Sequence, residues 1–292
     1  MAEKEGKPER KRTALIMEGG AMRGMFTCGV IDVLMENHIN FDGAAGISAG
    51  AAFGCNFKSR QIGRPIRYNK TFGKDPRYAS LRSLLKTGDY FGAKFCYETL
   101  PFELDVWDTK TFAENPLLFY IGATDVDTGE PRYHLCSDGG KTDLLWMQAS
   151  ASMPLLSNIV EVDGYRLLDG GISDAVPYGY MESLGFRRNV IVLTQPKGFT
   201  KKKSRAQVLI DIGLRKYPKI AEAMEHRHEM YNRQMKEIGE REQRGESLVI
   251  RPPQDLGIGR TEKDPEELER VYQIGRSETE KRLMEIREFL GE

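Results

Sequence analysis

The chain has few cysteines for its length. Four occur among 292 residues, widely spaced and without a paired Cys-x-x-Cys motif, and they are Cys28, Cys55, Cys96 and Cys136. This scarcity favours reduced thiols over a disulfide framework or a zinc site. The expected compartment is therefore the cytoplasm, and the sequence predicts neither a metal nor a cofactor.

A long hydrophobic run is also missing. No stretch approaches the roughly 20 apolar residues that span a bilayer, and the hydrophilic residues 1–11 lack the apolar segment of a signal peptide or an anchor. We expect residues 1–11 to form a disordered tail. Contact with a membrane would then be peripheral, at the lipid surface.

Neither sign of charge is in excess. Lysine and arginine together number 43, as do aspartate and glutamate, and no stripe of basic and aromatic residues resembles a nucleic-acid reader. The sequence therefore predicts no nucleic-acid partner. With 40% hydrophobic residues, the chain can bury one substantial core and carry a small appended unit.

The most informative motif is Gly46-Ile47-Ser48-Ala49-Gly50, which follows a short apolar run. A serine at a strand-to-helix elbow sits in a sharp turn that tolerates only very small residues two positions away on either side. The turn lifts the hydroxyl out for attack on a carbonyl. The motif predicts a nucleophilic serine, but it also arises by chance, so it needs support from elsewhere in the chain.

A glycine-rich turn precedes this serine. Residues 13–17 are apolar enough for a buried strand, and residues 25–34 carry apolar side chains at helical spacing. Between them lies Glu18-Gly19-Gly20-Ala21-Met22-Arg23-Gly24. Backbone N–H groups at the start of a helix favour an oxygen anion, so this loop is predicted to hold a developing oxyanion or a phosphate. Dinucleotide binding is disfavoured because Ala21 replaces the second glycine of Gly-x-Gly-x-x-Gly.

An acid follows late in the chain, in Asp169-Gly170-Gly171, directly after the short hydrophobic segment 165–168. In this setting the carboxylate emerges at the end of a strand. A serine hydroxyl is a poor nucleophile until a base takes its proton. Asp169 is therefore a candidate for that base.

Histidine, the usual base, is scarce. The chain has four, and none follows the serine in a glycine-flanked loop; they are His38, His134, His226 and His228. We expect all four at the surface. Only one strand and one helix precede the strand that carries Ser48, too few for an α/β-hydrolase. The sequence favours Asp169 acting directly on serine, and a histidine-dependent esterase that uses His134 stays open.

Together the three segments, in this order, resemble the patatin-like phospholipase family over residues 12–195. The resemblance implies an α/β fold with a central, mostly parallel sheet flanked by helices in three layers. It also implies Ser48 as nucleophile and Asp169 as its only protein partner. Residues 19–24 would form the oxyanion hole, with the amide of Ala49 as a further donor.

Four further positions follow from the resemblance. Residues 149–154 are similar to the family's Ala-Ser-x-x-x-Pro segment, at a helix end. Ala21 stands where many members have a third glycine, which is unstrained only at negative φ. Asp174 replaces a frequent asparagine; we expect a loop residue, which would raise the proton affinity of Asp169 only if the two faced each other. Arg23 is matched by a basic residue, which would orient the loop or attract an anionic head group.

The rest of the chain is less specific. Residues 59–115 mix basic, aromatic and glycine residues, and could be a lid, an acyl-chain pocket or ordinary helical packing. Residues 125–129 are predicted to be a hairpin turn, not a metal loop. The basic loop 197–203 would be solvated or touch anionic lipid. Residues 196–292 are charged and helix-rich apart from strand-like 248–250, and are expected to pack on the core, with a role in dimerisation open.

These features predict a serine acyl hydrolase that cleaves fatty acyl esters, of phospholipids or lysophospholipids, through a Ser48–Asp169 dyad and without a cofactor. The expected partner is a lipid or another acyl ester. The alternative from another class is a lipid-binding or acyl-binding module with little or no turnover.

Overall fold

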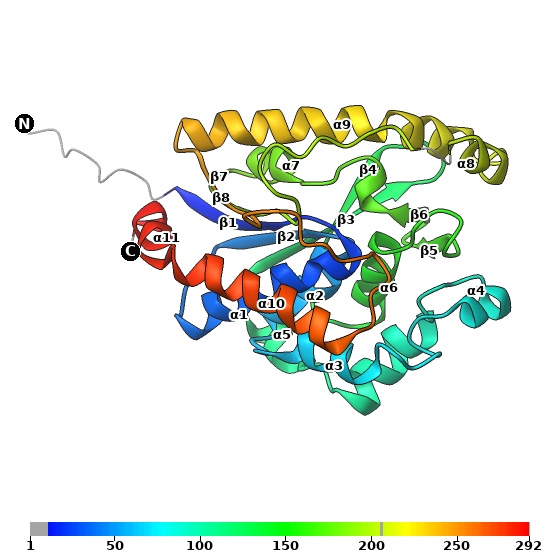
Figure 1. Ribbon diagram of the computed structural model, residues 1–292, viewed down its shortest axis with the longest axis horizontal. Coiled ribbons are helices and arrows are strands. Elements are labelled where there is room, and N and C mark those ends of the chain that lie inside the picture. The colour runs from blue at the N-terminus through cyan, green and yellow to red at the C-terminus, as the bar shows by residue number, and fades with distance from the viewer. Residues whose placement is uncertain (1–10, 205–206, 292) are drawn as a thin grey trace, which may run out of the picture.

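Figure 1 shows the computed structural model of the chain, which describes residues 11–204 and 207–291. Of the tail predicted for residues 1–11, only Lys11 lies within the described residues.

One mixed sheet runs through the molecule, with the strand order β5-β6-β3-β2-β1-β7-β8 and with β4 also paired to β3. Parallel pairs join β3, β2, β1, β7 and β8, whereas β4 and β6 run antiparallel to β3, and β5 runs antiparallel to β6. The strands are β1 (Arg12–Met17), β2 (Gly43–Ile47), β3 (Leu118–Asp125), β4 (Pro131–Leu135), β5 (Val160–Val162), β6 (Tyr165–Asp169), β7 (Phe186–Val192) and β8 (Ser247–Ile250).

Helices cover both faces of this sheet (Figure 1). The α-helices are α1 (Met25–Glu36), α2 (Ala49–Lys58), α3 (Arg64–Phe72), α4 (Leu81–Thr87), α5 (Thr109–Glu114), α6 (Lys141–Ser150), α7 (Tyr178–Ser183), α8 (Gln207–Gly213), α9 (Pro218–Gln243), α10 (Pro265–Glu280) and α11 (Leu283–Leu290). Short 3₁₀ turns η1 (Ala21–Gly24) and η3 (Gly170–Ile172) and a π-helical segment η2 (Phe95–Leu104) complete the described elements.

Strand β1 shows why the fold has three layers. Its residues alternate between faces: Leu15 and Met17 pack into one apolar core, and Ala14 and Ile16 pack into the other. All four are fully buried. A strand buried on both faces reads as a continuous apolar run, as residues 13–17 do. Helices α1, α2 and α10 lie over the first face, and α7 and α9 lie over the second (Figure 1).

The C-terminal region is part of this packing. Strand β8 extends the sheet beside β7, α9 lies across one face, and α10 lies against α1 on the other (Figure 1). The hydroxyl of Tyr272 on α10 donates a 2.8 Å hydrogen bond to the carboxylate of Asp32 on α1. Residues 196–292 therefore contact both helical layers.

The sheet topology brings three turns together. Strands β1 and β2 are parallel neighbours, so the turns that follow Met17 and Ile47 leave the same edge of the sheet. Strand β3 places Gly122 opposite Ile47. The antiparallel β6 ends with Asp169 opposite Ala123, one residue further along β3. The glycine turn, Ser48 and Asp169 consequently meet at one edge.

Candidate active site

Ser48 occupies the sharp turn between β2 and α2. Its φ is +54° and its ψ is −120°, a strained backbone conformation for a residue with a side chain. A Cβ atom at Gly46 would lie 2.3 Å from the Gly50 carbonyl oxygen, and one at Gly50 would lie 2.3 Å from the Met17 carbonyl oxygen. A side chain at either position would collide with the backbone, so both positions require glycine. This requirement explains the spacing of the motif.

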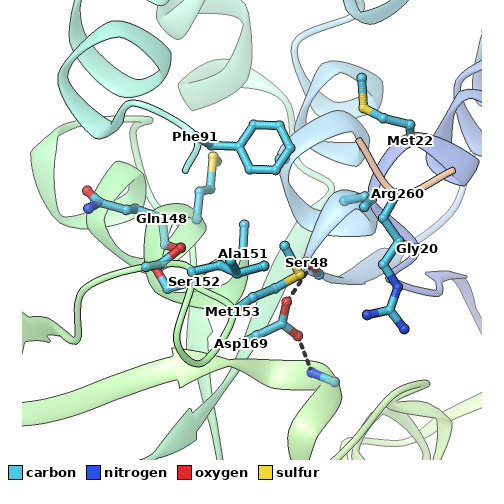
Figure 2. Close-up of a pocket in the computed structure, with 18 of the residues that line it drawn as sticks. Gly20, Met22, Ser48, Phe91, Gln148, Ala151, Ser152, Met153, Asp169 and Arg260 are labelled. Carbon is cyan, nitrogen blue, oxygen red and sulfur yellow. Dashed lines mark hydrogen bonds between the residues drawn. The ribbon is translucent and has the colours of Figure 1, made fainter. Parts of the chain in front are cut away.

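The Ser48 hydroxyl contacts the carboxylate of Asp169. Ser48 Oγ donates to Asp169 Oδ2 at 2.8 Å, and the Gly171 amide donates to Asp169 Oδ1 at 2.8 Å (Figure 2). Gly171 therefore fixes the carboxylate through the oxygen that the serine does not use. No histidine lies between the two side chains, which are 121 positions apart in the chain.

Ser150, at the end of α6, stabilises the turn at Ser48 through its hydroxyl group. Its hydroxyl accepts a hydrogen bond from the Ser48 amide at 2.8 Å and donates to the Gly122 carbonyl oxygen at 2.6 Å. The segment 149–154 is therefore a structural tie between the elbow and β3. The sequence placed this segment at a helix end but did not indicate this contact.

Burial raises the pKa of the Asp169 carboxyl, because a charged carboxylate loses its hydration there. The positive charge of Arg227 and the hydrogen bonds from Ser48 and Gly171 act in the opposite direction and lower that pKa. The balance leaves a carboxyl with more proton affinity than an ordinary aspartate, held close to the serine proton.

The glycine loop lies directly against the serine. A Cβ atom at Gly19 would be 2.9 Å from Ser48 Cβ, and one at Gly20 would be 2.7 Å from Thr194 Oγ1. Within the described part of the chain, the N–H groups of Gly19 and Gly20 donate to no protein acceptor. They are available to a ligand atom. Gly24 closes the loop against Phe53.

Ala21 does not meet the condition for an unstrained backbone. Its φ is +49°, in the left-handed region that glycine adopts without cost. The replacement of a glycine at this position therefore leaves a strained residue within the loop, next to Met22 and Arg23.

Glu18 anchors the start of the glycine loop through its carboxylate. Its Oε2 accepts from the Thr194 amide at 2.6 Å and from Thr194 Oγ1 at 3.1 Å, and its Oε1 accepts from the Tyr231 hydroxyl at 2.8 Å. Tyr231 lies on α9, so a C-terminal helix fixes the start of the glycine loop.

Asp174 lies in the loop before α7 and is buried. Its carboxylate accepts hydrogen bonds from Gln234 Nε2 at 2.6 Å and from the Tyr133 hydroxyl. Burial raises the pKa of Asp174, and these two hydrogen bonds lower it. The Asp174 carboxylate is thus paired with Gln234 and Tyr133, whereas the Asp169 carboxylate is paired with Ser48 and Gly171.

The histidines are distributed as follows. His38 and His226 are exposed. His134 is on β4, outside the residues that line the cavity beside Ser48, and its Nε2 is 2.7 Å from Asp143 Oδ1. His228 on α9 does line the cavity, a position that the sequence did not indicate. Its Nδ1 is 3.0 Å from the Glu225 carbonyl oxygen.

Among the residues that the structure describes, one group of side chains could hold a metal ion. His134, Cys136 and Asp143 have ligand atoms within 4.8 Å of one another. The Asp143 carboxylate already accepts three backbone N–H groups from residues 137–139. These three hydrogen bonds give Asp143 a structural role, which is to stabilise the turn at residues 137–139.

A cavity of about 510 Å³ opens above Ser48 and Asp169. Residues 59–115 contribute much of its wall, with Tyr68, Tyr78, Phe91, Tyr97, Leu100 and Trp107. Residues 59–115 thus contribute to a pocket wall, one of the arrangements expected from the sequence. Lys201 and Lys202 of the basic loop line the cavity as well.

Two arginines at the cavity were not singled out from the sequence. Arg227 on α9 donates through Nε to the Gly171 carbonyl oxygen at 2.5 Å, and Arg260 lies between β8 and α10. Both belong to the charged C-terminal region, where arginine is frequent. Nothing in their local pattern distinguishes them from solvated residues.

The helices of the described residues are all too short or too polar to cross a membrane.

Comparison with protein families gives two matches. The family model described as "Patatin-like phospholipase" matches residues 15–181, and one described as "Domain of unknown function (DUF6363)" matches residues 217–291. The first match covers the strands and turns that carry Ser48 and Asp169. The second covers α9, α10 and α11.

Individual relatives match between 60% and 95% of the chain. The uncharacterized protein YjjU of Escherichia coli K12 is 31% identical over 195 residues, which are 63% of this chain and 52% of that protein. The lysophospholipase nte1 of Aspergillus terreus is 27% identical over 186 residues, 60% of this chain but only 11% of the relative. The solved structure of VipD from Legionella pneumophila is 12% identical with a TM-score of 0.46, over 95% of this chain and 67% of that one.

Proposed function

The chain belongs to the patatin-like phospholipase family, and from this premise we propose that it is a serine acyl hydrolase that cleaves fatty acyl esters of phospholipids or lysophospholipids. The single observation that carries the proposal is the 2.8 Å hydrogen bond from Ser48 Oγ to Asp169 Oδ2, beside the unpaired amides of Gly19 and Gly20.

In the first half of the reaction, Asp169 accepts the Ser48 proton while Ser48 Oγ bonds to the ester carbonyl carbon. The carbonyl oxygen becomes an oxyanion, which the amides of Gly19 and Gly20 stabilise together with the amide of Ala49 at the start of α2. The bond from the carbonyl carbon to the alcohol oxygen then breaks, and Asp169 gives its proton to the leaving alcohol. The acyl group stays on Ser48.

In the second half, water replaces the alcohol. Asp169 takes a proton from water, whose oxygen attacks the acyl carbon, and the proton returns to Ser48 as the fatty acid leaves. The raised pKa of Asp169 supports this role, because a carboxyl with increased proton affinity is a better proton acceptor.

The cavity supports an acyl substrate. Apolar and aromatic side chains of residues 59–115 form the wall on one side, and Phe91 lies opposite the Ser48–Asp169 pair (Figure 2). Ala151 and Met153 lie next to Ser48 in the same view. A mostly apolar cleft with a few polar groups at one end is the usual form of a site for an apolar ligand.

We further propose that α4 contacts the lipid surface. Leu81 is 70% exposed and Leu85 is 87% exposed, and they are four residues apart on one helix face. Arg82 and Lys86 are exposed on the same helix and suit anionic head groups. Asp89, just beyond α4, lines the cavity, so a lipid bound by α4 would enter nearby.

Labelling with a fluorophosphonate and hydrolysis of a lysophospholipid test the proposal. Ser48→Ala is expected to abolish labelling, and Asp169→Asn to lower turnover by about a hundredfold or more because the proton acceptor is lost. Ser183→Ala, an exposed serine on α7, is the matched control and should label as wild type. Undiminished labelling of Ser48→Ala would refute the assignment.

The rival functions give different results. A histidine-dependent esterase would lose activity in His134→Ala or His228→Ala but keep it in Asp169→Asn. A lipid-binding module would bind lipid in stoichiometric amount and form no product with any ester over a range of pH.

A further inference from the structure

Four cationic side chains line one part of the cavity next to the proposed nucleophile. Arg23 comes from the glycine loop, Lys201 from the loop after β7, Arg227 from α9 and Arg260 from the segment between β8 and α10. In Figure 2, Arg260 lies on the same side of Ser48 as Gly20, whereas Gln148 lies on the opposite side. We call these four residues the cationic wall.

The members of the cationic wall are close enough to repel one another. Burial, together with the positive charges of Arg227, Arg260 and Arg23, lowers the pKa of Lys201 to about 8, although the carboxylate of Glu18 acts to raise it. Burial likewise lowers the pKa of Arg227, and Arg260 and Arg23 add to that effect, whereas the carboxylates of Asp169 and Glu18 raise it. Holding like charges together at a partly buried site costs free energy unless an anion offsets them.

Three carboxylates of the protein act on this wall from a distance: Glu18 on Arg23, Lys201 and Arg227, Asp169 on Arg227, and Asp255 on Arg23. Within residues 11–204 and 207–291, no carboxylate oxygen lies within 4.0 Å of a nitrogen of the four side chains. Two of these acids are hydrogen-bonded elsewhere: Glu18 to Thr194 and Tyr231, and Asp169 to Ser48 and Gly171.

Several donors of the cationic wall are unused. Arg23 Nε is buried and has no hydrogen-bond partner. Arg227 uses Nε on the Gly171 carbonyl oxygen, which leaves its two terminal nitrogens. Arg260 is exposed at the cavity, so a ligand can reach it from solvent. Buried donors without a protein partner are normally satisfied by a ligand or by water.

We propose that the cationic wall binds the phosphate of an acyl ester whose head group is a phosphate monoester, so that the preferred substrate is a dianionic lipid of the phosphatidic or lysophosphatidic acid class. The inference rests on the proposed function and deepens it. The four cations outnumber the carboxylates of Glu18, Asp169 and Asp255 that act on them, so the wall keeps a net positive charge, which favours a dianionic over a zwitterionic head group. Arginine binds such a phosphate through paired, charge-assisted hydrogen bonds.

The proposal also assigns a role to the C-terminal region. Two of the four cations, Arg227 and Arg260, lie in the segment 217–291 that matches a domain of unknown function. Tyr231 of the same segment fixes Glu18. This segment is then the part of the chain that selects the head group, whereas residues 15–181 carry the nucleophile and the acid.

The test compares two short-chain lysolipids with the same acyl chain, lysophosphatidic acid and lysophosphatidylcholine, below their micelle-forming concentrations. We expect wild-type kcat/KM to be about tenfold or more higher for lysophosphatidic acid. In Arg260→Met the KM for lysophosphatidic acid should rise about tenfold, a larger factor than the rise in KM for lysophosphatidylcholine. Arg260→Lys should restore part of the loss. Arg233→Met, an exposed arginine of α9 outside the cavity lining, is the control.

Binding of both lipids to Ser48→Ala is measured in parallel, which separates the two proposals. Tighter binding of lysophosphatidic acid, lost on adding Arg260→Met, supports the cationic wall even if no ester is turned over. Equal affinity and equal kcat/KM for the two lipids would overturn the cationic wall and leave the hydrolase intact. Hydrolysis that survives Ser48→Ala would instead overturn the proposed function.

Discussion

Gly275 on α10 lies directly against the backbone of Phe26 on α1: a Cβ atom at Gly275 would be 2.0 Å from the Phe26 carbonyl oxygen. The contact is reciprocal, since a Cβ atom at Gly29 would be 2.1 Å from the Tyr272 carbonyl oxygen. The two helices therefore pack backbone to backbone, with α1 following the glycine loop and α10 belonging to the C-terminal region.

This contact predicts that Gly275→Ala destabilises the protein. The added methyl group must push α1 and α10 apart, and overpacking of this kind costs about 1–3 kcal/mol. Gly239→Ala on α9 is the matched control, because nothing lies within 4 Å of its Cβ position. That substitution should stabilise the helix by about 0.5–1 kcal/mol. Urea unfolding of both variants measures the difference, and equal midpoints would contradict the close packing.

The contact between Gly19 and Ser48 predicts a catalytic defect without unfolding. In Gly19→Ala the new methyl group would lie 2.9 Å from Ser48 Cβ and 3.0 Å from the Ile47 carbonyl oxygen, so the loop must move and its amide leaves the oxyanion position. Loss of one such donor lowers kcat by about 100-fold or more. Gly179→Ala on α7, with nothing within 4 Å, serves as control. Near-normal kcat in Gly19→Ala would exclude this loop from the oxyanion hole.

Asp32 predicts how stability depends on pH. Its fully buried carboxylate accepts hydrogen bonds from Tyr272 at 2.8 Å and from the Gly63 amide at 2.9 Å, and burial raises its pKa from 3.8 to about 6. The folded state thus binds this proton more tightly than the unfolded state. The stabilisation is complete below about pH 4 and is lost as the pH rises through 6.

Replacement of Asp32 by asparagine removes this titration. Between pH 4 and 7, the unfolding free energy of the wild type should fall by up to about 3 kcal/mol relative to Asp32→Asn. Urea unfolding at several pH values measures it. Glu288→Gln, an exposed acid on α11, is the control and should follow the wild type. If the unfolding free energies of the wild type and Asp32→Asn changed with pH in the same way, Asp32 would not be the group whose protonation stabilises the folded state.

Local patterns in the sequence predicted the parts of the fold that local physics determines. The apolar run 13–17 and the elbow motif correspond to β1, β2 and the start of α2. Residues 125–129 form the expected hairpin turn between β3 and β4. Buried strands and tight glycine turns have strong local signals, because the residues that build them are selected by their immediate neighbours.

Long-range contacts had no such signal. Ser150 supports Ser48 from 102 positions away, and Tyr231 anchors Glu18 from 213 positions away. Arg227 and Arg260 come from a highly charged region that is rich in arginine, so their position at the cavity depends on how α9 and the segment before α10 pack. The left-handed conformation of Ala21 could not be predicted from the sequence either, because alanine normally avoids this conformation.

The exposed leucines of α4 predict how the protein reaches its substrate. In the double variant Leu81→Asp and Leu85→Asp, two carboxylates replace the apolar face and repel anionic lipid, so binding to vesicles of phosphatidylcholine and phosphatidic acid should fall about tenfold or more in a flotation assay. Hydrolysis of a water-soluble ester should be unchanged, because neither residue lines the cavity. Met284→Asp, at a 72% exposed position on α11, is the control for an added acid on an exposed apolar position. If vesicle binding were as strong in the double variant as in wild type, α4 would not be the surface that meets the membrane.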